Sequence, residues 1–298
     1  MRRITLVLMV LAILMTTWIY REQVASTGAV VKSGEAVISL GQDLTEDQKS
    51  QVVSYFETKT DLAKVRYVSV SNQEERRYLE GKIAESLIGT RAISCALVTG
   101  SAKGQGIDVQ THNINGVTPF MYANAANTAG IEDVQIFVEA PFEVSGTAAL
   151  TGIIKAFELA SGKALNETAK DIANQELAES SKLGEKIGQD NAGKIIYEVK
   201  KQVVQKKIAD PALIRQIIVQ VSADLNISLA EDDVNRIVGL MQNLNKVNIN
   251  ISQLNEQLDK LQKGIEDVRT QTDQAQGFFQ KLVKFIRNLF QGLTGAIS

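Results

Sequence analysis

Few side chains of this chain are suited to chemistry at neutral pH, and the first to consider is His112, its single histidine. It alternates with Asp108 and Gln110, so we expect it on the more polar face of a strand, near the strand's end. Because the chain has one histidine, zinc sites and catalytic sites that need several histidines are excluded. His112 and Asn113 then allow two interpretations: the two side chains bind a ligand, or His112 is a structural residue bonded to neighbouring backbone.

Cys95 is the only cysteine, which excludes both an intrachain disulfide and a CxxC motif. It shares one face of a predicted strand with apolar residues, so we expect a buried core thiol rather than a nucleophile. Acidic residues cluster at predicted helix starts, where they interact favourably with the helix dipole: Glu46-Asp47, Glu74-Glu75 and Glu231-Asp232-Asp233. The sequence therefore assigns no catalytic residue, no metal site and no cofactor, and it favours a protein that is not an enzyme.

The stretch APFEVSGTAALTGIIKAFELASG, residues 140–162, has the strand, turn and helix order of many phosphate sites. Gly146 and Gly152 are six residues apart and Ile153, not lysine, follows the second glycine, so the P-loop pattern is not met. A weak anion site at Ser145, Gly146 and Thr147 is one interpretation. The other is a close-packed corner, in which Gly146 supplies the turn and Gly152 admits a neighbouring backbone.

Strand and helix signals alternate through the first half of the chain. The strands are predicted at 36–40, 65–70, 91–98, 107–114 and 133–138. Capping boxes at Thr45 and Ser71, and the Thr118-Pro119 pair, predict where three helices begin. We expect the third and fourth strands to form an antiparallel hairpin. The predicted class is α+β (α/β-like), with an N-terminal mixed five-stranded sheet covered by helices.

Strand signals stop after Gly162, and the rest of the chain is predicted to be helical. A third capping box is expected at Ser228. Apolar residues repeat every three or four positions over 237–268, which predicts a long heptad-patterned helix or coiled coil. The predicted domains are therefore an α/β domain at 30–162 and a helical domain at 163–298. Self-association through the helical domain is one expected role.

The final segment, 278–293, is predicted to be an amphipathic helix. Its apolar face and cationic residues give the candidate surface for a membrane or a partner: Phe278, Phe279, Lys281, Leu282, Lys284, Phe285, Ile286, Arg287, Leu289 and Phe290. Two interpretations stay open. The helix binds an anionic lipid surface, or it docks on the helical domain.

The N-terminus predicts a location outside the cytoplasm. Met1-Arg2-Arg3 is followed by a mostly apolar run from Ile4 to Tyr20, the layout of a secretory signal. Residues 1–29 are interpreted as a cleaved signal peptide or a retained N-terminal anchor. The chain without them has 29 basic and 33 acidic side chains, which argues against nucleic-acid binding.

Four stretches together resemble the YpuA-like family of secreted Gram-positive bacterial proteins. These stretches, called the family segments below, are residues 89–94 (GTRAIS), 111–114 (THNI), 140–152 (APFEVSGTAALTG) and 174–177 (NQEL). The resemblance implies an extracellular or cell-envelope protein whose domain has no assigned function, and it carries over no catalytic residues.

These observations favour a secreted or envelope-associated binding or structural module, with a cell-envelope component or the membrane surface as its partner. One alternative is an envelope hydrolase with a site near His112 and Ser145. Another is peripheral membrane binding through the terminal helix.

Overall fold

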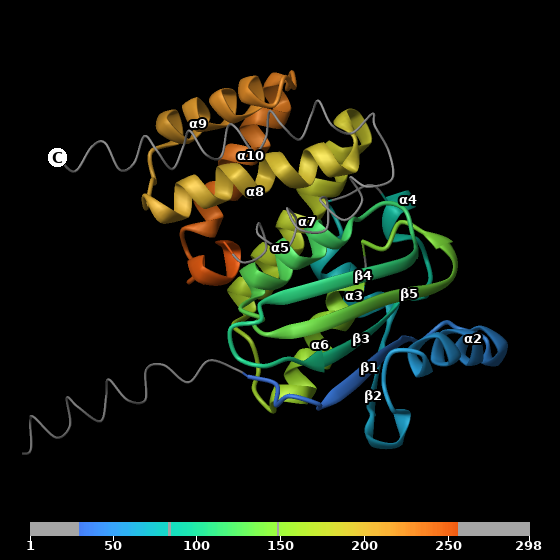
Figure 1. Ribbon diagram of the computed structural model, residues 1–298. Coiled ribbons are helices and arrows are strands. Elements are labelled where there is room, and N and C mark those ends of the chain that lie inside the picture. Colours follow the sequence, from blue (N-terminus) through green and yellow to red (C-terminus); the bar gives the residue numbers. More distant parts are fainter. Residues whose placement is uncertain (1–29, 83–84, 148, 256–298) are drawn as a thin grey trace, which may run out of the picture.

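The computed structural model describes residues 30–255, except 83–84 and 148. A five-stranded sheet with helices on its faces is followed by a layer of helices, which confirms the predicted α+β class (Figure 1). The predicted signal segment 1–29, the heptad positions beyond 255 and the terminal helix 278–293 lie outside the described residues.

The strands are β1 (Ala36–Gly41), β2 (Arg66–Val70), β3 (Cys95–Gly100), β4 (Ile107–Ile114) and β5 (Val134–Val144). The helices of the sheet region are α2 (Glu46–Glu57), the 3-10 helix η1 (Leu62–Lys64), α3 (Asn72–Leu79), α4 (Glu85–Ile88), α5 (Pro119–Ala129) and α6 (Ala149–Ser161). The helical layer has α7 (Glu167–Ile187), α8 (Gln189–Gln205), α9 (Pro211–Asp224) and α10 (Glu231–Leu244). No helix among the described residues has the length and apolar character needed to span a bilayer.

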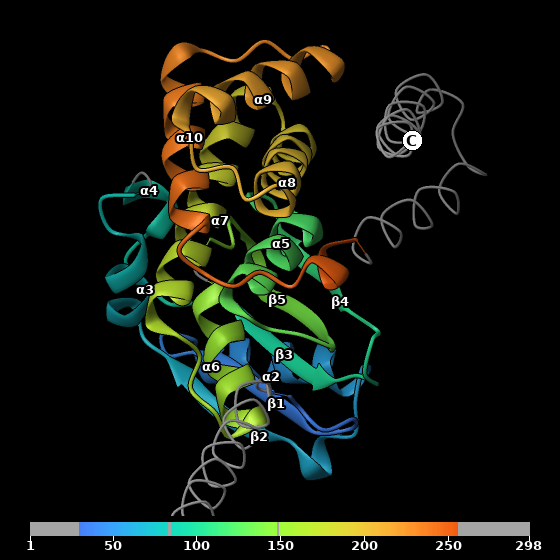
Figure 2. The ribbon, with the colours of Figure 1, turned by 90° about the vertical axis from the view of Figure 1, so that its left-hand side faces the viewer.

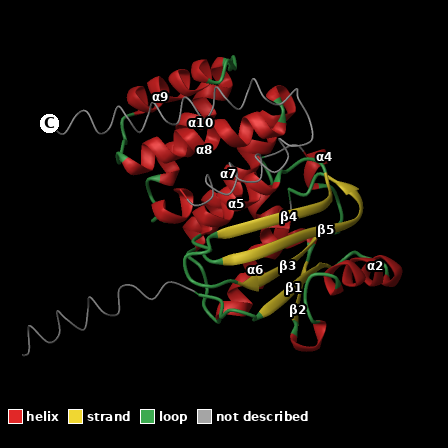
Figure 3. Cartoon of the chain, viewed as in Figure 1, coloured by secondary structure: helices red, strands yellow, loops and turns green. Residues whose placement is uncertain are grey.

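The strand order is β2-β1-β3-β5-β4 (Figure 3). β1 and β2 are parallel, as expected for strands joined through a single helix. The predicted hairpin is wrong, because β5 lies between β3 and β4 and is antiparallel to the first and parallel to the second. The reason is burial: β5 is buried on both faces from Ile136 to Ala140, whereas β4 exposes polar residues and takes the outer position.

The loop from β3 to β4 passes around the start of β5. There the Asp133 carboxylate accepts hydrogen bonds from the backbone N–H groups of Gly104 and Gly106, at 3.0 and 2.9 Å. The same oxygen accepts a hydrogen bond from the Gln253 amide at 2.9 Å. Asp133 therefore ties the crossing loop and the last described residues to the sheet.

Side chains of the central strands alternate between two apolar layers. Ile38 and Leu40 of β1 pack with Val52 and Phe56 of α2 on one face. Val37, which precedes Ile38, belongs to the larger core on the other face, where α6 covers β1 and β3. That larger core runs without interruption from the sheet through α5 and α6 into α7–α10.

Capping motifs in the sequence predicted most of these helix starts correctly. The capping boxes of Thr45 with Gln48 and of Ser71 with Glu74 are formed, and Thr118 caps α5. The capping box predicted at Ser228 is wrong, because α10 begins after Ala230 and no side chain caps it.

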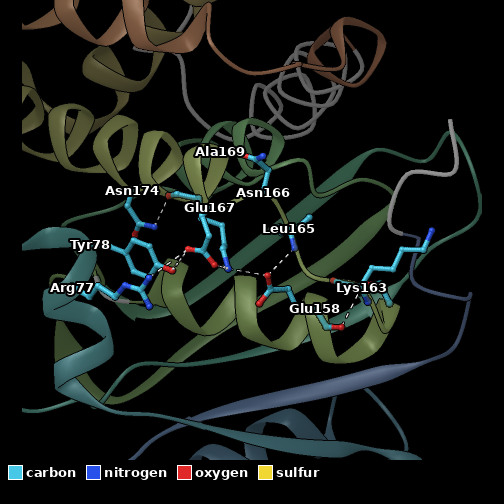
Figure 4. Close-up of polar contacts among 11 residues, drawn as sticks. Arg77, Tyr78, Glu158, Lys163, Leu165, Asn166, Glu167, Ala169 and Asn174 are labelled. Atoms are coloured by element: carbon cyan, nitrogen blue, oxygen red, sulfur yellow. Dashed lines mark hydrogen bonds and ion pairs between the residues drawn. The ribbon is translucent and has the colours of Figure 1, made fainter. Parts of the chain in front are cut away.

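The helical layer lies beyond β4, and α7 runs from it down past the sheet (Figure 2). A polar network holds the start of α7 against α3 and α6 (Figure 4). Lys170 Nζ lies 2.6 Å from a Glu167 oxygen and 3.0 Å from a Glu158 oxygen, and Tyr78 of α3 donates to Glu167. Burial alone would lower the pKa of Lys170, but the hydrogen bonds that its ammonium donates to these carboxylates raise it.

The heptad-patterned stretch is not one continuous helix. α10 ends at Leu244, and helix resumes only at Ile251. The asparagines of this stretch explain the break, because Asn favours helix ends over helix interiors. The Asn250 side chain accepts a hydrogen bond from the Gln253 N–H at 3.2 Å and so starts the next helical turn.

Candidate functional site

Four parallel strands end on the same side of the sheet. β1, β2, β4 and β5 all point the same way, and β3, which is antiparallel, begins where they end. We call this side the carboxyl edge. In open sheets with parallel strands, ligands bind in the crevice beyond the carboxyl ends of the strands. The carboxyl edge is therefore the first place to look for a site.

The topology brings three of the four family segments to this edge. Residues 89–94 lead into β3, 111–114 finish β4, and 140–152 link the end of β5 to α6. They meet because Cys95 pairs with Glu139, and Glu139 pairs in turn with His112. The fourth segment, 174–177, lies in α7 and is largely buried.

His112 is paired with a buried carboxylate. Its Nδ1 lies 2.7 Å from Glu139 Oε2, and the side chains are 53% and 2% exposed, respectively. Tyr55 of α2 stacks on the imidazole, with ring centroids 5.1 Å apart. Burial raises the pKa of Glu139, and the hydrogen bond from His112 partly opposes that rise. The partner of His112 is thus a side chain, whereas backbone was the expected structural partner.

Cys95 is a core thiol, as predicted. It is 1% exposed and sits in the apolar layer under α2. Burial raises its pKa to about 12, so the reactive thiolate is disfavoured at neutral pH. Cys95 and His112 are therefore neighbours of Glu139 on adjacent strands, but the thiol is not available to act with the imidazole.

Asn113 stabilises an irregularity in β5. The pairing of β4 with β5 shifts between His112 and Ile114, because residues 140–143 bulge out of the strand. Asn113 adopts a left-handed backbone conformation, and its amide donates to the Ala140 carbonyl at 2.7 Å. From α2, Gln51 donates to the Pro141 carbonyl at 3.2 Å. The bulge is thus held from both sides.

Ser145, Gly146 and Thr147 form a close-packed corner. Gly146 has a positive φ of 80°, and a Cβ there would lie 2.4 Å from Ile114 Cγ2. The buried Tyr122 hydroxyl donates to the Gly146 carbonyl. Thr147 is fully buried, with its hydroxyl 3.4 Å from that of Ser145. Of the three, Ser145 and Gly146 reach the solvent-facing pocket described next.

Gly152, farther along the same segment, has a different neighbour from the one expected. A Cβ there would lie 2.5 Å from Ser39 Oγ, so the glycine admits a side chain of β1 rather than a backbone.

An open pocket of about 270 Å³, which we call the edge pocket, lies between the first and third family segments. Its apolar wall is formed by Ile88, Ile93, Phe142 and Val144. Its polar lining comes from Thr90, Arg91, Ser94 and Ser145, next to Gly89 and Gly146. His112, Asn113 and Thr147 do not line it, so the edge pocket contains only part of the predicted set.

Sequence reasoning missed Arg91 and Phe142 as pocket residues. One signal was available: no acidic residue occurs between Ser86 and Ile107, so Arg91 has no acidic neighbour along the chain. Nothing local indicated that this loop meets the end of β5.

A second depression, the side groove, lies at the same edge between α2 and β2. It measures about 380 Å³ and is lined in part by Leu44, Glu46, Lys49 and the half-exposed Tyr67. An acidic and a basic residue both line it, so its walls favour neither sign of charge.

Among the residues that the structure describes, the most deeply buried ion pair lies away from this edge, in the helical layer. Lys200 of α8 and Glu176 of α7 are 0% and 1% exposed, with Nζ 3.0 and 3.1 Å from the two carboxylate oxygens. Lys200 also donates to the Asn124 carbonyl and the Thr128 hydroxyl of α5. No group of three or more His, Cys, Asp or Glu suited to a metal ion occurs among the described residues.

Comparisons with known proteins agree with the resemblance noted in the sequence. Residues 40–261 match the family described as "Protein of unknown function (DUF1002)". The chain is 38% identical over 261 residues to "Uncharacterized protein YpuA" of Bacillus subtilis (strain 168), covering 87% of this chain and 89% of that protein. No solved structure matches the chain. The chain therefore belongs to the YpuA-like DUF1002 family, a family of unknown function.

Proposed function

We propose that the protein is a non-enzymatic binding module of the cell envelope, and that the carboxyl edge is its binding face. The observation that carries this proposal is the edge pocket, because two family segments far apart in sequence form an accessible pocket there. The signal-like segment 1–29 supports a location outside the cytoplasm.

The arrangement of reactive side chains favours binding over catalysis. Ser145 opens into the edge pocket, whereas His112 stacks on Tyr55 and bonds to Glu139. A serine nucleophile needs a base within hydrogen-bond reach. The hydrolase alternative depends on four side chains meeting in one pocket, those of His112, Asn113, Ser145 and Thr147, and of these only Ser145 lines the edge pocket. Membrane binding by 278–293 and self-association stay predictions.

The location is tested by fractionating a Gram-positive host that expresses the full chain. We expect the protein in the medium or the envelope fraction. Recovery in the cytoplasm would contradict the proposal.

The binding face is tested with purified cell-wall sacculi and, separately, membrane vesicles from the same host. We expect one of these fractions to retain the protein, and Phe142→Ser to lower that retention several-fold. Phe142 is 41% exposed and lines the edge pocket. The matched control is Tyr67→Ser, because Tyr67 is 48% exposed and lines the side groove instead of the edge pocket. Retention by neither fraction, or an equal loss with both variants, would refute the proposal.

A further inference from the structure

We infer that the edge pocket binds a small carboxylate with a short aliphatic body, and that Arg91 holds the carboxylate. This inference rests on the proposed function, because it names the ligand class for the same face. It is drawn from the charge, shape and surroundings of the pocket.

The charge argument starts from the arginines. Six arginines lie among residues 30–255, and five of them form ion pairs with carboxylates: Arg66, Arg76, Arg77, Arg215 and Arg236. Arg91 is the exception, since it makes no ion pair with any described residue, and it is exposed. No acidic residue lines the edge pocket. The pocket therefore presents one uncompensated guanidinium, which suits a monoanion and can bind a carboxylate through two parallel hydrogen bonds.

The neighbouring groups add to this preference. Hydroxyl groups of Thr90, Ser94 and Ser145 line the same pocket and can donate to an anion. Gly146 stands shortly before the thirteen-residue helix α6, so the positive end of that helix dipole lies on the same side.

The apolar wall and the size of the pocket describe the rest of the ligand. Ile88, Ile93, Phe142 and Val144 form a surface that favours an aliphatic group over a sugar or a bare ion. A volume of about 270 Å³ is below the range of roughly 300–1,000 Å³ that is usual for drug-sized ligands. A ligand of a few carbon atoms fits this space. It can be a free acid or the carboxyl end of a peptide.

The inference is tested by two-dimensional NMR. The full chain is expressed with ¹⁵N label, the protein is purified in the form that the cell produces, and spectra are recorded while it is titrated with four organic probes. Isovalerate and its uncharged amide represent the free acid, and N-acetyl-Ala-Ala and its C-terminal amide represent a peptide end. We expect one acid to bind with a Kd on the order of 1–10 mM, with shifts confined to residues 88–94 and 142–146. Its amide should bind at least roughly tenfold more weakly. The acid that binds more tightly identifies the source.

Arg91→Gln should weaken binding by the same factor of roughly ten or more. Lys103→Gln is the matched control, because it removes one positive charge from an exposed loop at the opposite end of the sheet, and it should leave binding within about twofold. Equal binding of acid and amide, or no effect of Arg91→Gln, would overturn the inference. Tighter binding of inorganic phosphate than of either acid would also overturn it.

These outcomes separate the inference from the proposed function. If Phe142→Ser lowers envelope retention while neither acid binds, the binding face stands and the ligand class is wrong. If an acid binds through Arg91 while retention does not depend on Phe142, the pocket is a carboxylate site and the envelope role is wrong.

Discussion

Glu176 in the helical layer and Glu139 at the carboxyl edge are both buried carboxylates with a basic partner, yet their surroundings differ. Lys200, the partner of Glu176, is fully buried, and its ammonium also bonds to two groups of α5. His112, the partner of Glu139, is half exposed. The fully buried Lys200–Glu176 pair, called the sealed pair below, can only hold helices together. The His112–Glu139 pair, called the edge pair, can exchange protons with solvent. The difference separates a structural polar cluster from a surface suited to binding.

Breaking the sealed pair should have the largest effect. Lys200→Met leaves the Glu176 carboxylate buried without its cation, and we expect a loss of about 3–5 kcal/mol in the free energy of unfolding, measured by urea denaturation. Lys186→Met is the matched control, because Lys186 is 48% exposed and its partner Asp233 keeps Arg236. That variant should lose less than about 1 kcal/mol. Similar losses for both variants would show that the Lys200 pair is not sealed in solution.

A third buried carboxyl group, Glu75, sharpens the comparison because no cation among the described residues pairs with it. It is 1% exposed and accepts a hydrogen bond from Asn72, and burial raises its pKa to about 8. The folded state therefore binds this proton more tightly than the unfolded state. Its contribution to stability is complete below pH 4.5 and is lost as the pH rises to about 8.

Glu75→Gln removes this dependence. Between pH 5 and pH 8.5 we expect its stability relative to the unmodified protein to rise by roughly 2–4 kcal/mol, measured by urea denaturation at both values. The neighbouring Glu74→Gln is the control. Lys155 bonds to Glu74 and holds its pKa low against the effect of burial, and Gln at this position can still complete the capping box. If the stability difference between Glu75→Gln and the unmodified protein is the same at pH 5 and pH 8.5, the Glu75 carboxyl is exposed to water.

The smallest effect is expected at the edge pair. His112→Ala removes the hydrogen bond that opposes the effect of burial on Glu139, so the pKa of Glu139 should rise further. The free energy of unfolding at pH 7 should fall by about 1–3 kcal/mol, because a buried carboxyl group loses its hydrogen-bond partner. Carboxyl ¹³C NMR over a pH series measures the pKa. Tyr55→Phe, which keeps the ring beside His112, should leave the pKa of Glu139 nearly unchanged. An unshifted Glu139 in His112→Ala would show that the pair does not form in solution.

Local sequence determined a good part of this protein. Short runs of strand-favouring residues located all five strands, and hydroxyl residues with a Gln or Glu three positions later marked two helix starts. Alternation placed Cys95 in the core and His112 on the accessible side of its strand. These features follow from neighbouring residues alone, because each depends on backbone geometry and on which face of an element is apolar.

Only the tertiary structure decided what depends on distant residues. The position of β5 between β3 and β4 reflects competition among strands for the buried places in the sheet, which no single strand reveals. No feature of the sequence distinguishes Lys200 and Glu176 from charges on an exposed helix face, and it is the packing of α5, α7 and α8 that buries them. Arg91 and Ser145 are 54 residues apart and line one pocket because an antiparallel strand begins where a parallel strand ends. Such contacts are set by long-range packing, so they lay beyond what spacing along the chain could predict.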